Sequence, residues 1–200
     1  MVLTLLWVPP IRLQLAAPTA ALERFAVACA RAPLSDHPRD RLDAPPRLWH
    51  VSDREEVVGR GAAAYARAEE ALLRLECMQL PWLRATVQGD VLAICSRQFG
   101  LVWLMNANRM ARPLPPADSS AAVGWDTTIR HVLAGEERLS VRWDRESDAV
   151  VYRVRSYSRP RHAFSVLTYP VVRLQQRRFA HDSAQKMRLV CDDVDGAEKI

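Results

Sequence analysis

The chain has 200 residues, of which 49% are hydrophobic and 26% charged, a balance that suits one globular domain with a sizeable core. Its net charge is +5, but Lys186 and Lys199 are its only lysines, so the basic residues are almost all arginine. This bias is more typical of a GC-rich genome than of nucleic-acid binding, which needs further features besides basic charge. We therefore expect no nucleic-acid partner.

The first residues, 1–11, are apolar and are predicted to form an extra strand or an unstructured extension. Pro9-Pro10 interrupts the run, which makes it a poor signal peptide and too short for a membrane span, so we expect a cytoplasmic protein. The cysteines share no metal-type spacing and are predicted to be free thiols: Cys29, Cys77, Cys95 and Cys191. We expect neither a cofactor nor a metal.

A first helix is predicted after Thr19, which is a good N-cap, and it should end before Pro33. Residues 33–47 are rich in proline and aspartate and predict a surface loop. His37 lies in this loop, and we expect its ring to be solvated rather than to bind a ligand.

Residues 48–58 carry strand signals, and the Gly-Arg-Gly segment 59–61 predicts a tight turn from strand to helix. This segment is not a phosphate loop, because it lacks the third glycine of a dinucleotide fingerprint and the Gly-Lys-Ser/Thr of a P-loop. Residues 62–77 place apolar side chains at helical spacing, and Pro81 prevents the helix from continuing.

The second half of the chain is dominated by strands, predicted over 82–94 with a turn at 88–90, over 99–110 and over 121–131. Apolar and basic side chains then alternate on both sides of a polar turn within 136–156, which predicts a half-buried hairpin. A long helix is predicted from Ala163 to Met187, burying Leu167, Val171, Leu174 and Phe179. Grouped strands with helices at the ends of the run indicate an α+β fold.

Several motifs follow one another along this second half: Gly124, Trp125 and Thr127; His131, Gly135, Glu136 and Glu137; Ser158, Arg159 and Pro160; and Tyr169, Pro170, Arg173, Gln176, Phe179 and Ser183. Together with the glycine turn and helix of 57–72, they resemble the functionally uncharacterised DUF1990 family, also called UPF0548. The resemblance covers roughly residues 12–187. Asp126 and Arg130 stand where the family pattern has glycine.

The resemblance implies a layout similar to the helix-grip, START-like group, in which a curved antiparallel sheet grips a long C-terminal helix. Proteins of that layout usually hold an apolar ligand between sheet and helix, although a fold alone does not determine function. We expect an N-terminal helix and proline-rich loop over 1–47, part of or packed on a DUF1990-like domain over 48–188. A flexible acidic tail is expected over 189–200.

His131 with Glu136 and Glu137 is the one constellation that suggests a site, since a histidine and a glutamate can shift each other's pKa and act as acid and base. Alternation places Glu137 on the apolar side of its strand and Glu136 outward. We favour a structural role, in which Arg155 or Arg159 neutralises Glu137.

The leading functional hypothesis is a non-enzymatic protein that binds a small apolar or amphipathic ligand between sheet and helix. The expected ligand-binding residues are Trp125, His131, Glu137, Trp143, Tyr152 and Arg159. Two alternatives remain open: a small enzyme that uses the His/Glu pair of 131–137, and a peripheral membrane or protein-interaction module that uses the basic C-terminal helix. The oligomeric state is left open.

Overall fold

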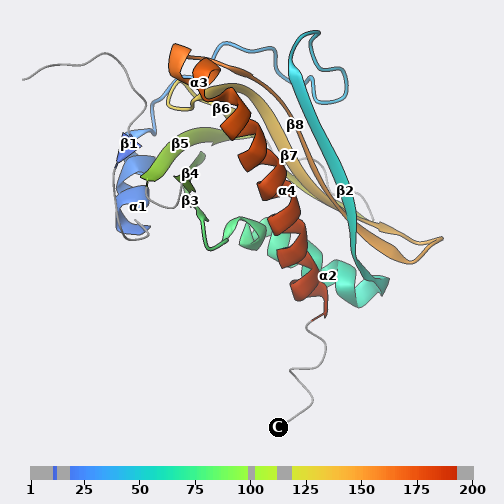
Figure 1. Ribbon diagram of the computed structural model, residues 1–200. Helices are drawn as coiled ribbons and strands as arrows, with labels where there is room; N and C mark the ends of the chain where they lie inside the picture. Colours follow the sequence, from blue (N-terminus) through green and yellow to red (C-terminus); the bar gives the residue numbers. More distant parts are fainter. Residues whose placement is uncertain (1–10, 13–18, 99–101, 112–118, 193–200) are drawn as a thin grey trace, which may run out of the picture.

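The protein is described by a computed structural model over residues 11–12, 19–98, 102–111 and 119–192 (Figure 1). Its elements are β1 (Ile11–Arg12), α1 (Thr19–Ala28), β2 (His50–Arg60), α2 (Gly61–Leu73), the 3₁₀ turn η1 (Glu76–Met78), β3 (Leu83–Gln88), β4 (Val91–Gln98), β5 (Val102–Met110), β6 (Ser120–Thr127), β7 (Leu133–Asp144), β8 (Ala149–Pro160), α3 (Ala163–Leu167) and α4 (Tyr169–Asp192). Of the predicted extension at 1–11 only Ile11 is described, and of the predicted tail at 189–200 only 189–192, which continue α4.

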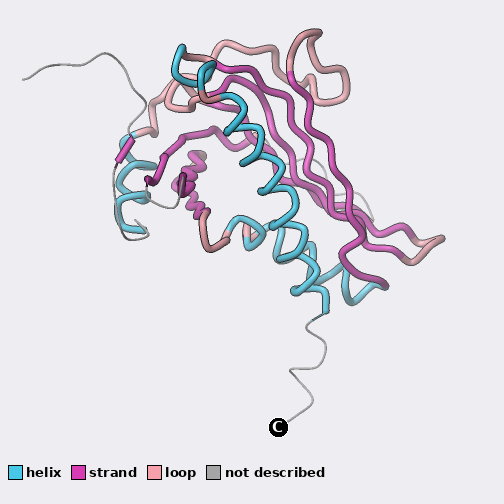
Figure 2. The backbone as a smooth tube through the Cα atoms, in the orientation of Figure 1, coloured by secondary structure: helices cyan, strands magenta, loops and turns pink. Residues whose placement is uncertain are grey.

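The strands form one eight-stranded sheet in the order β2-β8-β7-β6-β5-β4-β3, with β1 paired to β5. Every described strand pair is antiparallel. The sheet is curved, and α4 crosses its concave side along most of its length (Figures 1 and 2). The predicted α+β fold, with a curved antiparallel sheet around a long C-terminal helix, is therefore confirmed.

The inward-facing apolar side chains of the β7–β8 hairpin form the floor of the main core. Leu139 and Val141 on β7, with Val150 and Tyr152 on β8, are each at most 1% exposed. Because successive strand side chains point to opposite faces, the intervening arginines lie on the convex side. The residues of α4 that pack onto this floor are buried: Phe179, Ala180, Ser183, Ala184, Met187 and Cys191.

The predicted C-terminal helix differs from the structure in its start, its end and its rotation. It is divided into α3 and α4 at Thr168, and it continues to Asp192. Phe179 is buried as predicted, but Leu167 and Leu174 are 81% and 63% exposed, so their predicted burial is wrong. Counting back from Phe179 by three, four and seven residues places Gln176, Gln175 and Val172 toward the sheet instead. Polar side chains therefore occupy part of the inward stripe of α4.

The strand-to-helix turn at residues 59–61 is confirmed, since β2 ends at Arg60 and Gly61 begins α2 with φ +83°. A Cβ added to Gly59 would lie 2.8 Å from the Cβ of Cys191 and 2.9 Å from that of Ala64, so glycine allows β2 to pass close to both helices. Helix α2 is shorter than the predicted 62–77: it ends at Leu73, and Leu75 takes a left-handed conformation before η1.

The convex side of the sheet is covered by the N-terminal part of the chain. Helix α1 packs on β3, β4 and β5, where Leu22 and Ala26 join Val91 and Trp103 in a second hydrophobic cluster. The loop 33–47 is not simply a solvated surface, because Leu42 is only 5% exposed. Among the described helices, none is both long and apolar enough to cross a membrane.

Candidate functional site

A cavity of about 150 Å³ lies between the concave face of the sheet and the first half of α4. Its walls combine aromatic and aliphatic side chains with a smaller polar group, and its residues include Met78, Trp82, Leu83, Ile94, Trp125, His131, Glu137, Ser156, Val172, Gln175, Gln176 and Phe179. The cavity exists because the inward positions of α4 at 172–176 are not filled by large apolar side chains. Small cavities with apolar walls and a few placed polar groups are typical of ligand sites.

Glu137 brings a carboxyl group into this cavity. It lies on the inner face of β7, and its Cα partners are Trp125 on β6 and Ser156 on β8. Burial raises the pKa of Glu137 to about 7, although a hydrogen bond from the Trp125 side chain partly opposes this shift. Near neutral pH the carboxyl is therefore present in both protonation states.

His131 supplies a donor at the same cavity. It lies in the turn after β6, where the backbone N–H of Leu133 donates to its Nδ1 at 2.9 Å. Burial, with a smaller contribution from the charge of Arg161, lowers the pKa of His131 to about 4. Because Nδ1 accepts a hydrogen bond and the ring is neutral, the remaining proton resides on Nε2, which is a hydrogen-bond donor.

Two glutamines of α4 complete the polar part of the wall. Gln176 donates from Nε2 to the Oγ of Ser158 at 3.3 Å. The Oε1 atoms of Gln175 and Gln176 are both buried without a hydrogen-bond partner among the described residues. Buried acceptors are normally satisfied, so this wall has hydrogen-bonding capacity that the protein leaves unused. Neither glutamine was among the expected ligand-binding residues, although their spacing from Phe179 indicated an inward position.

Three of the six expected ligand-binding residues, Trp125, His131 and Glu137, line the cavity. Tyr152 does not, because it is buried deeper in the core, with its hydroxyl beside Cys77 and Ser183.

Trp143 and Arg159 also lie away from the cavity. The Trp143 ring stacks on Tyr65 at 6.3 Å, and its Nε1 donates to Asp148 at 3.0 Å near the hairpin tip. The Arg159 guanidinium lies 4.6 Å from the centre of the Trp49 ring.

The expected ion pair between Glu137 and an arginine of β8 is wrong. Glu137 lies directly opposite Ser156, so the flanking Arg155 points to the other face of the sheet. Arg155 pairs there with Asp43 at 2.6 Å. The side-chain partner of Glu137 is instead the indole of Trp125.

Glu136 points outward as expected, but it is only 7% exposed because the loop 33–47 covers it. Tyr157 donates to its Oε1 at 2.8 Å, and the backbone N–H of Arg41 donates to its Oε2 at 3.3 Å. Burial raises the pKa of Glu136, while the Tyr157 hydrogen bond lowers it.

His37 is the main correction to the sequence analysis. Its side chain is 0% exposed rather than solvated, and Nε2 lies 2.8 Å from Asp126 Oδ1. The partner is 89 positions away in the sequence, so no local pattern indicated the contact.

The fold and the cavity define a class of protein: an α+β domain whose curved antiparallel sheet wraps a C-terminal helix, with a small, partly polar cavity between the two. The model of the domain of unknown function DUF1990 matches residues 34–186, and the chain belongs to this family. A UPF0548 protein of Arabidopsis thaliana is 30% identical over 142 residues, covering 64% of this chain and 67% of that protein. A UPF0548 protein of Dictyostelium discoideum is 30% identical over 146 residues, covering 65% and 67%.

Solved structures show a more distant likeness. A hypothetical protein of Helicobacter pylori has a TM-score of 0.49 at 12% identity, covering 78% of this chain and 97% of that chain. A truncated norcoclaurine synthase of Thalictrum flavum has a TM-score of 0.45 at 11% identity, covering 71% and 94%.

Proposed function

We propose that this protein binds a small amphipathic molecule in the cavity between the sheet and α4. The observation that carries the proposal is the combination, in one cavity, of apolar walls with the Glu137 carboxyl and the His131 ring. Apolar walls favour a ligand with apolar surface to bury, and the buried polar groups favour a ligand that can form hydrogen bonds with them.

The size of the cavity limits the ligand. A dry cavity of about 150 Å³ is known to hold a single benzene ring in another protein, whereas drug-sized ligands need about 300 Å³ or more. The present cavity also has a volume of about 150 Å³, so one ring or a short branched chain would fill it.

The polar wall determines which group the ligand should carry. The Glu137 carboxylate and the buried Oε1 atoms of Gln175 and Gln176 are acceptors, and the two Oε1 atoms have no partner among the described residues. A ligand with a hydroxyl or amine group would satisfy these acceptors, whereas a plain hydrocarbon would not. We therefore propose a one-ring or similarly small ligand with at least one hydrogen-bond donor.

Isothermal titration of the purified chain with phenol and with toluene tests this function. Phenol should bind with a Kd of about 1 mM or tighter, corresponding to about −4 kcal/mol, and toluene should bind at least tenfold more weakly. Glu137→Gln should weaken phenol binding about fivefold or more, because a hydrogen bond to a charged acceptor is stronger than one to a neutral amide.

A matched pair of helix variants supplies the control. Val172→Trp places a large ring in the cavity wall and should abolish phenol binding, whereas Leu174→Trp adds the same ring at a 63% exposed position and should not. If the two variants bound phenol with equal affinity, the ligand would not lie in this cavity. If neither phenol nor toluene bound the unmodified chain, the proposed function would lose its support.

The enzyme hypothesis receives less support from the geometry. It would be favoured by convergence of His131, a glutamate and Arg159, but Arg159 stacks on Trp49 and does not line the cavity.

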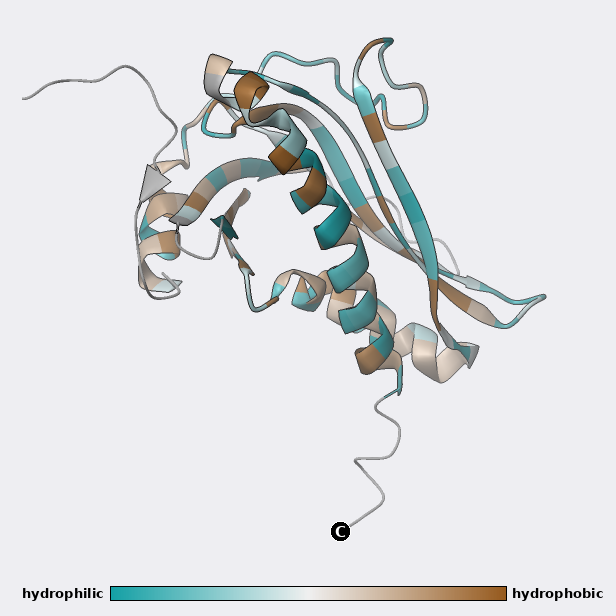
Figure 3. Ribbon diagram, in the orientation of Figure 1, coloured by the Kyte–Doolittle hydropathy of each residue, from teal (hydrophilic) through white to brown (hydrophobic). Residues whose placement is uncertain are grey.

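A second candidate function, contact with an anionic membrane surface, rests on a separate observation. Leu167 and Leu174 are exposed near the start of α4, where Figure 3 shows hydrophobic residues beside a mostly hydrophilic helix face. Arg177 is exposed one turn after Arg173 on the same helix. Apolar and basic side chains together suit an anionic bilayer surface. Cosedimentation with phosphatidylserine vesicles but not with phosphatidylcholine vesicles, lost in Leu174→Ser, would support it; equal sedimentation with both would exclude it.

A further inference from the structure

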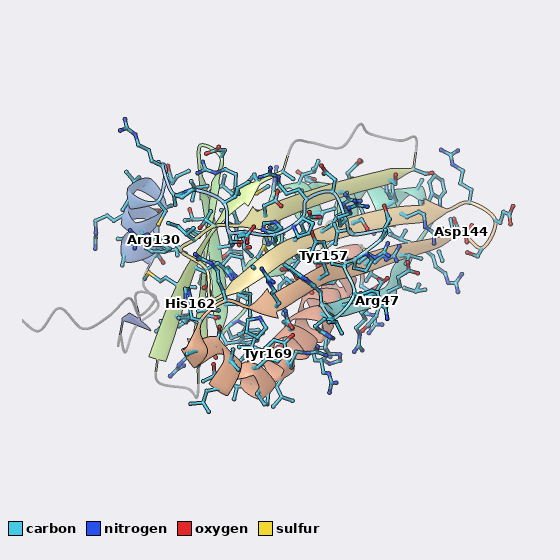
Figure 4. The ribbon with its side chains drawn as sticks, turned by 90° about the horizontal axis from the view of Figure 1, so that it is seen from above. Arg47, Arg130, Asp144, Tyr157, His162 and Tyr169 are labelled. Atoms are coloured by element: carbon cyan, nitrogen blue, oxygen red, sulfur yellow. The ribbon has the colours of Figure 1, made fainter. Side chains whose placement is uncertain are left out.

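On the convex side of the sheet, three side chains of metal-ligating type converge from three parts of the chain. Asp126 on β6 and Glu136 on β7 are direct Cα partners, so their side chains lie next to each other on one face. His37 reaches them from the loop 33–47. One ligand atom from each of the three lies within 4.8 Å of the other two. Figure 4 shows Tyr157, which contacts Glu136, near the middle of the sheet and far from the hairpin tip at Asp144.

The His37 ring is held in the orientation that a metal-binding histidine needs. Its side chain is fully buried, and Nε2 points to Asp126 at 2.8 Å. Its other nitrogen, Nδ1, lies 3.0 Å from the carbonyl oxygen of Ser35, to which it can donate, and 3.0 Å from the Ser35 hydroxyl, from which it can accept. In this structure Nε2 donates to Asp126, and an ion that replaces this proton would bind the Nε2 lone pair while Nδ1 donates to the Ser35 carbonyl, the usual support of a metal-bound histidine.

The two carboxylates supply oxygen ligands, and a cation bound between them would reduce their mutual repulsion. Like charges directly opposite each other on neighbouring strands repel. Glu136 accepts hydrogen bonds from Tyr157 and from the backbone of Arg41, both of which are neutral donors. Asp126 keeps 17% of its side chain exposed, so the cluster has a route to solvent.

We propose that His37, Asp126 and Glu136 form a binding site for a divalent first-row transition ion of the zinc type. One imidazole nitrogen and two carboxylate oxygens are a ligand set that Zn²⁺ accepts, with water as a fourth ligand on the open side. Adjacent ligands of such an ion lie about 3 to 3.5 Å apart, close to the separation of the His37 and Asp126 atoms. The ion joins the loop 33–47 to β6 and β7, so its role is to fasten the N-terminal covering to the sheet.

The test uses the untagged full chain, freed of metals with a chelator and then titrated with Zn²⁺. One ion should bind per chain, and Zn²⁺ at a hundredfold excess over its Kd should raise the melting temperature by about 5 to 10 °C. Mg²⁺, which prefers oxygen ligands and keeps its own waters, should bind at least a hundredfold more weakly.

Variants distinguish this site from adventitious binding. His37→Gln and Asp126→Asn should each weaken Zn²⁺ binding at least tenfold and remove the thermal shift, whereas His181→Gln, at an exposed position on α4, should change neither. Asp126→Asn retains an acceptor for His37, so it reports on the site if His37→Gln fails to fold. Absence of saturable Zn²⁺ binding to the unmodified chain, or unchanged binding in Asp126→Asn, would show that the cluster is only a hydrogen-bonded contact.

Discussion

Trp125 and Glu137 face each other across β6 and β7, and the Trp125 side chain hydrogen-bonds to the Glu137 carboxyl inside the cavity. This pair joins an indole of the cavity wall to a carboxyl on the inner face of β7. Trp125 itself is 3% exposed, so the bond is shielded from bulk water.

Trp125→Phe should lower the free energy of unfolding by about 1 to 3 kcal/mol, because a buried polar group loses its partner. Urea denaturation measures this change. In the double variant with Glu137→Leu, which removes the carboxyl as well, the cost should be clearly less than the sum of the two single costs. Trp143→Phe is the matched control: it also removes an indole hydrogen bond, but an exposed one, and should cost less than about 1 kcal/mol. Additive costs in the double variant would mean that the two side chains do not interact energetically.

Phe179→Ala should lower the free energy of unfolding by about 3 to 5 kcal/mol, since it removes a buried ring where α4 meets the sheet. Leu174→Ala, five residues earlier on the same helix but largely exposed, should change it by less than about 0.5 kcal/mol. Thermal or urea unfolding of both variants provides the comparison. Similar losses at the two positions would contradict the rotation of α4 described above.

The contribution of His131 to stability should fall as the pH drops from about 6.5 to about 4, while Glu137, whose pKa burial raises to about 7, contributes in the opposite direction over much of the same range. Burial and the charge of Arg161 lower the pKa of His131 to about 4 in the folded protein, below the ordinary value of 6.5. In this window the unfolded chain binds a proton that the folded chain does not, so acid favours unfolding by up to about 3 kcal/mol from this residue. His50 and His162 also have lowered pKa values, through burial and nearby arginines, and add to the same trend.

Urea unfolding at several pH values, compared between the unmodified chain and His131→Gln, isolates the contribution of His131. Relative to the unmodified chain, His131→Gln should gain up to about 3 kcal/mol of stability between pH 6.5 and 4, because it lacks the acid penalty of His131 and keeps Glu137. His181→Gln, at an exposed position, should show the same pH dependence as the unmodified chain. An unchanged slope in His131→Gln would assign the acid sensitivity to other groups.

Gly59→Ala should destabilise the protein by about 1 to 3 kcal/mol, because its new methyl group would overlap Cys191 and Ala64 at distances that packed carbons do not adopt. Thermal unfolding measures the loss. The double variant Gly59→Ala/Ala64→Gly lacks one of the two overlapping contacts. Its loss of stability should therefore be smaller than the sum of the losses in the two single variants. A fully stable Gly59→Ala variant would mean that β2 and the end of α4 are not tightly packed.

Much of the fold follows from patterns within short stretches of the chain. Alternation in 136–156 predicted the β7–β8 hairpin and placed Leu139, Val141 and Tyr152 inward, as the structure confirms. The same alternation placed Glu137 on the inner face. Side-chain direction along a strand follows from covalent geometry alone, so neighbouring residues are enough to predict it.

The candidate sites depend on contacts between segments that are far apart in the sequence. His37 meets Asp126 and Glu136 only because the loop 33–47 folds back over the convex face. Arg159 was expected at the cavity but stacks on Trp49, and Leu174 was expected inside but is exposed. The rotation of α4 about its own axis turns Gln175 and Gln176 toward the sheet.

The sequence by itself thus determined the order of the elements, the inner and outer faces of the strands and the family of the chain. The tertiary structure alone decided the volume of the cavity, the rotation of α4 above it and the partners of Glu137 and His37. The physical reason is the range of the interactions involved. Local backbone geometry acts between neighbours in the chain, whereas cavities and side-chain clusters depend on the curvature of the sheet and on packing between segments far apart in sequence.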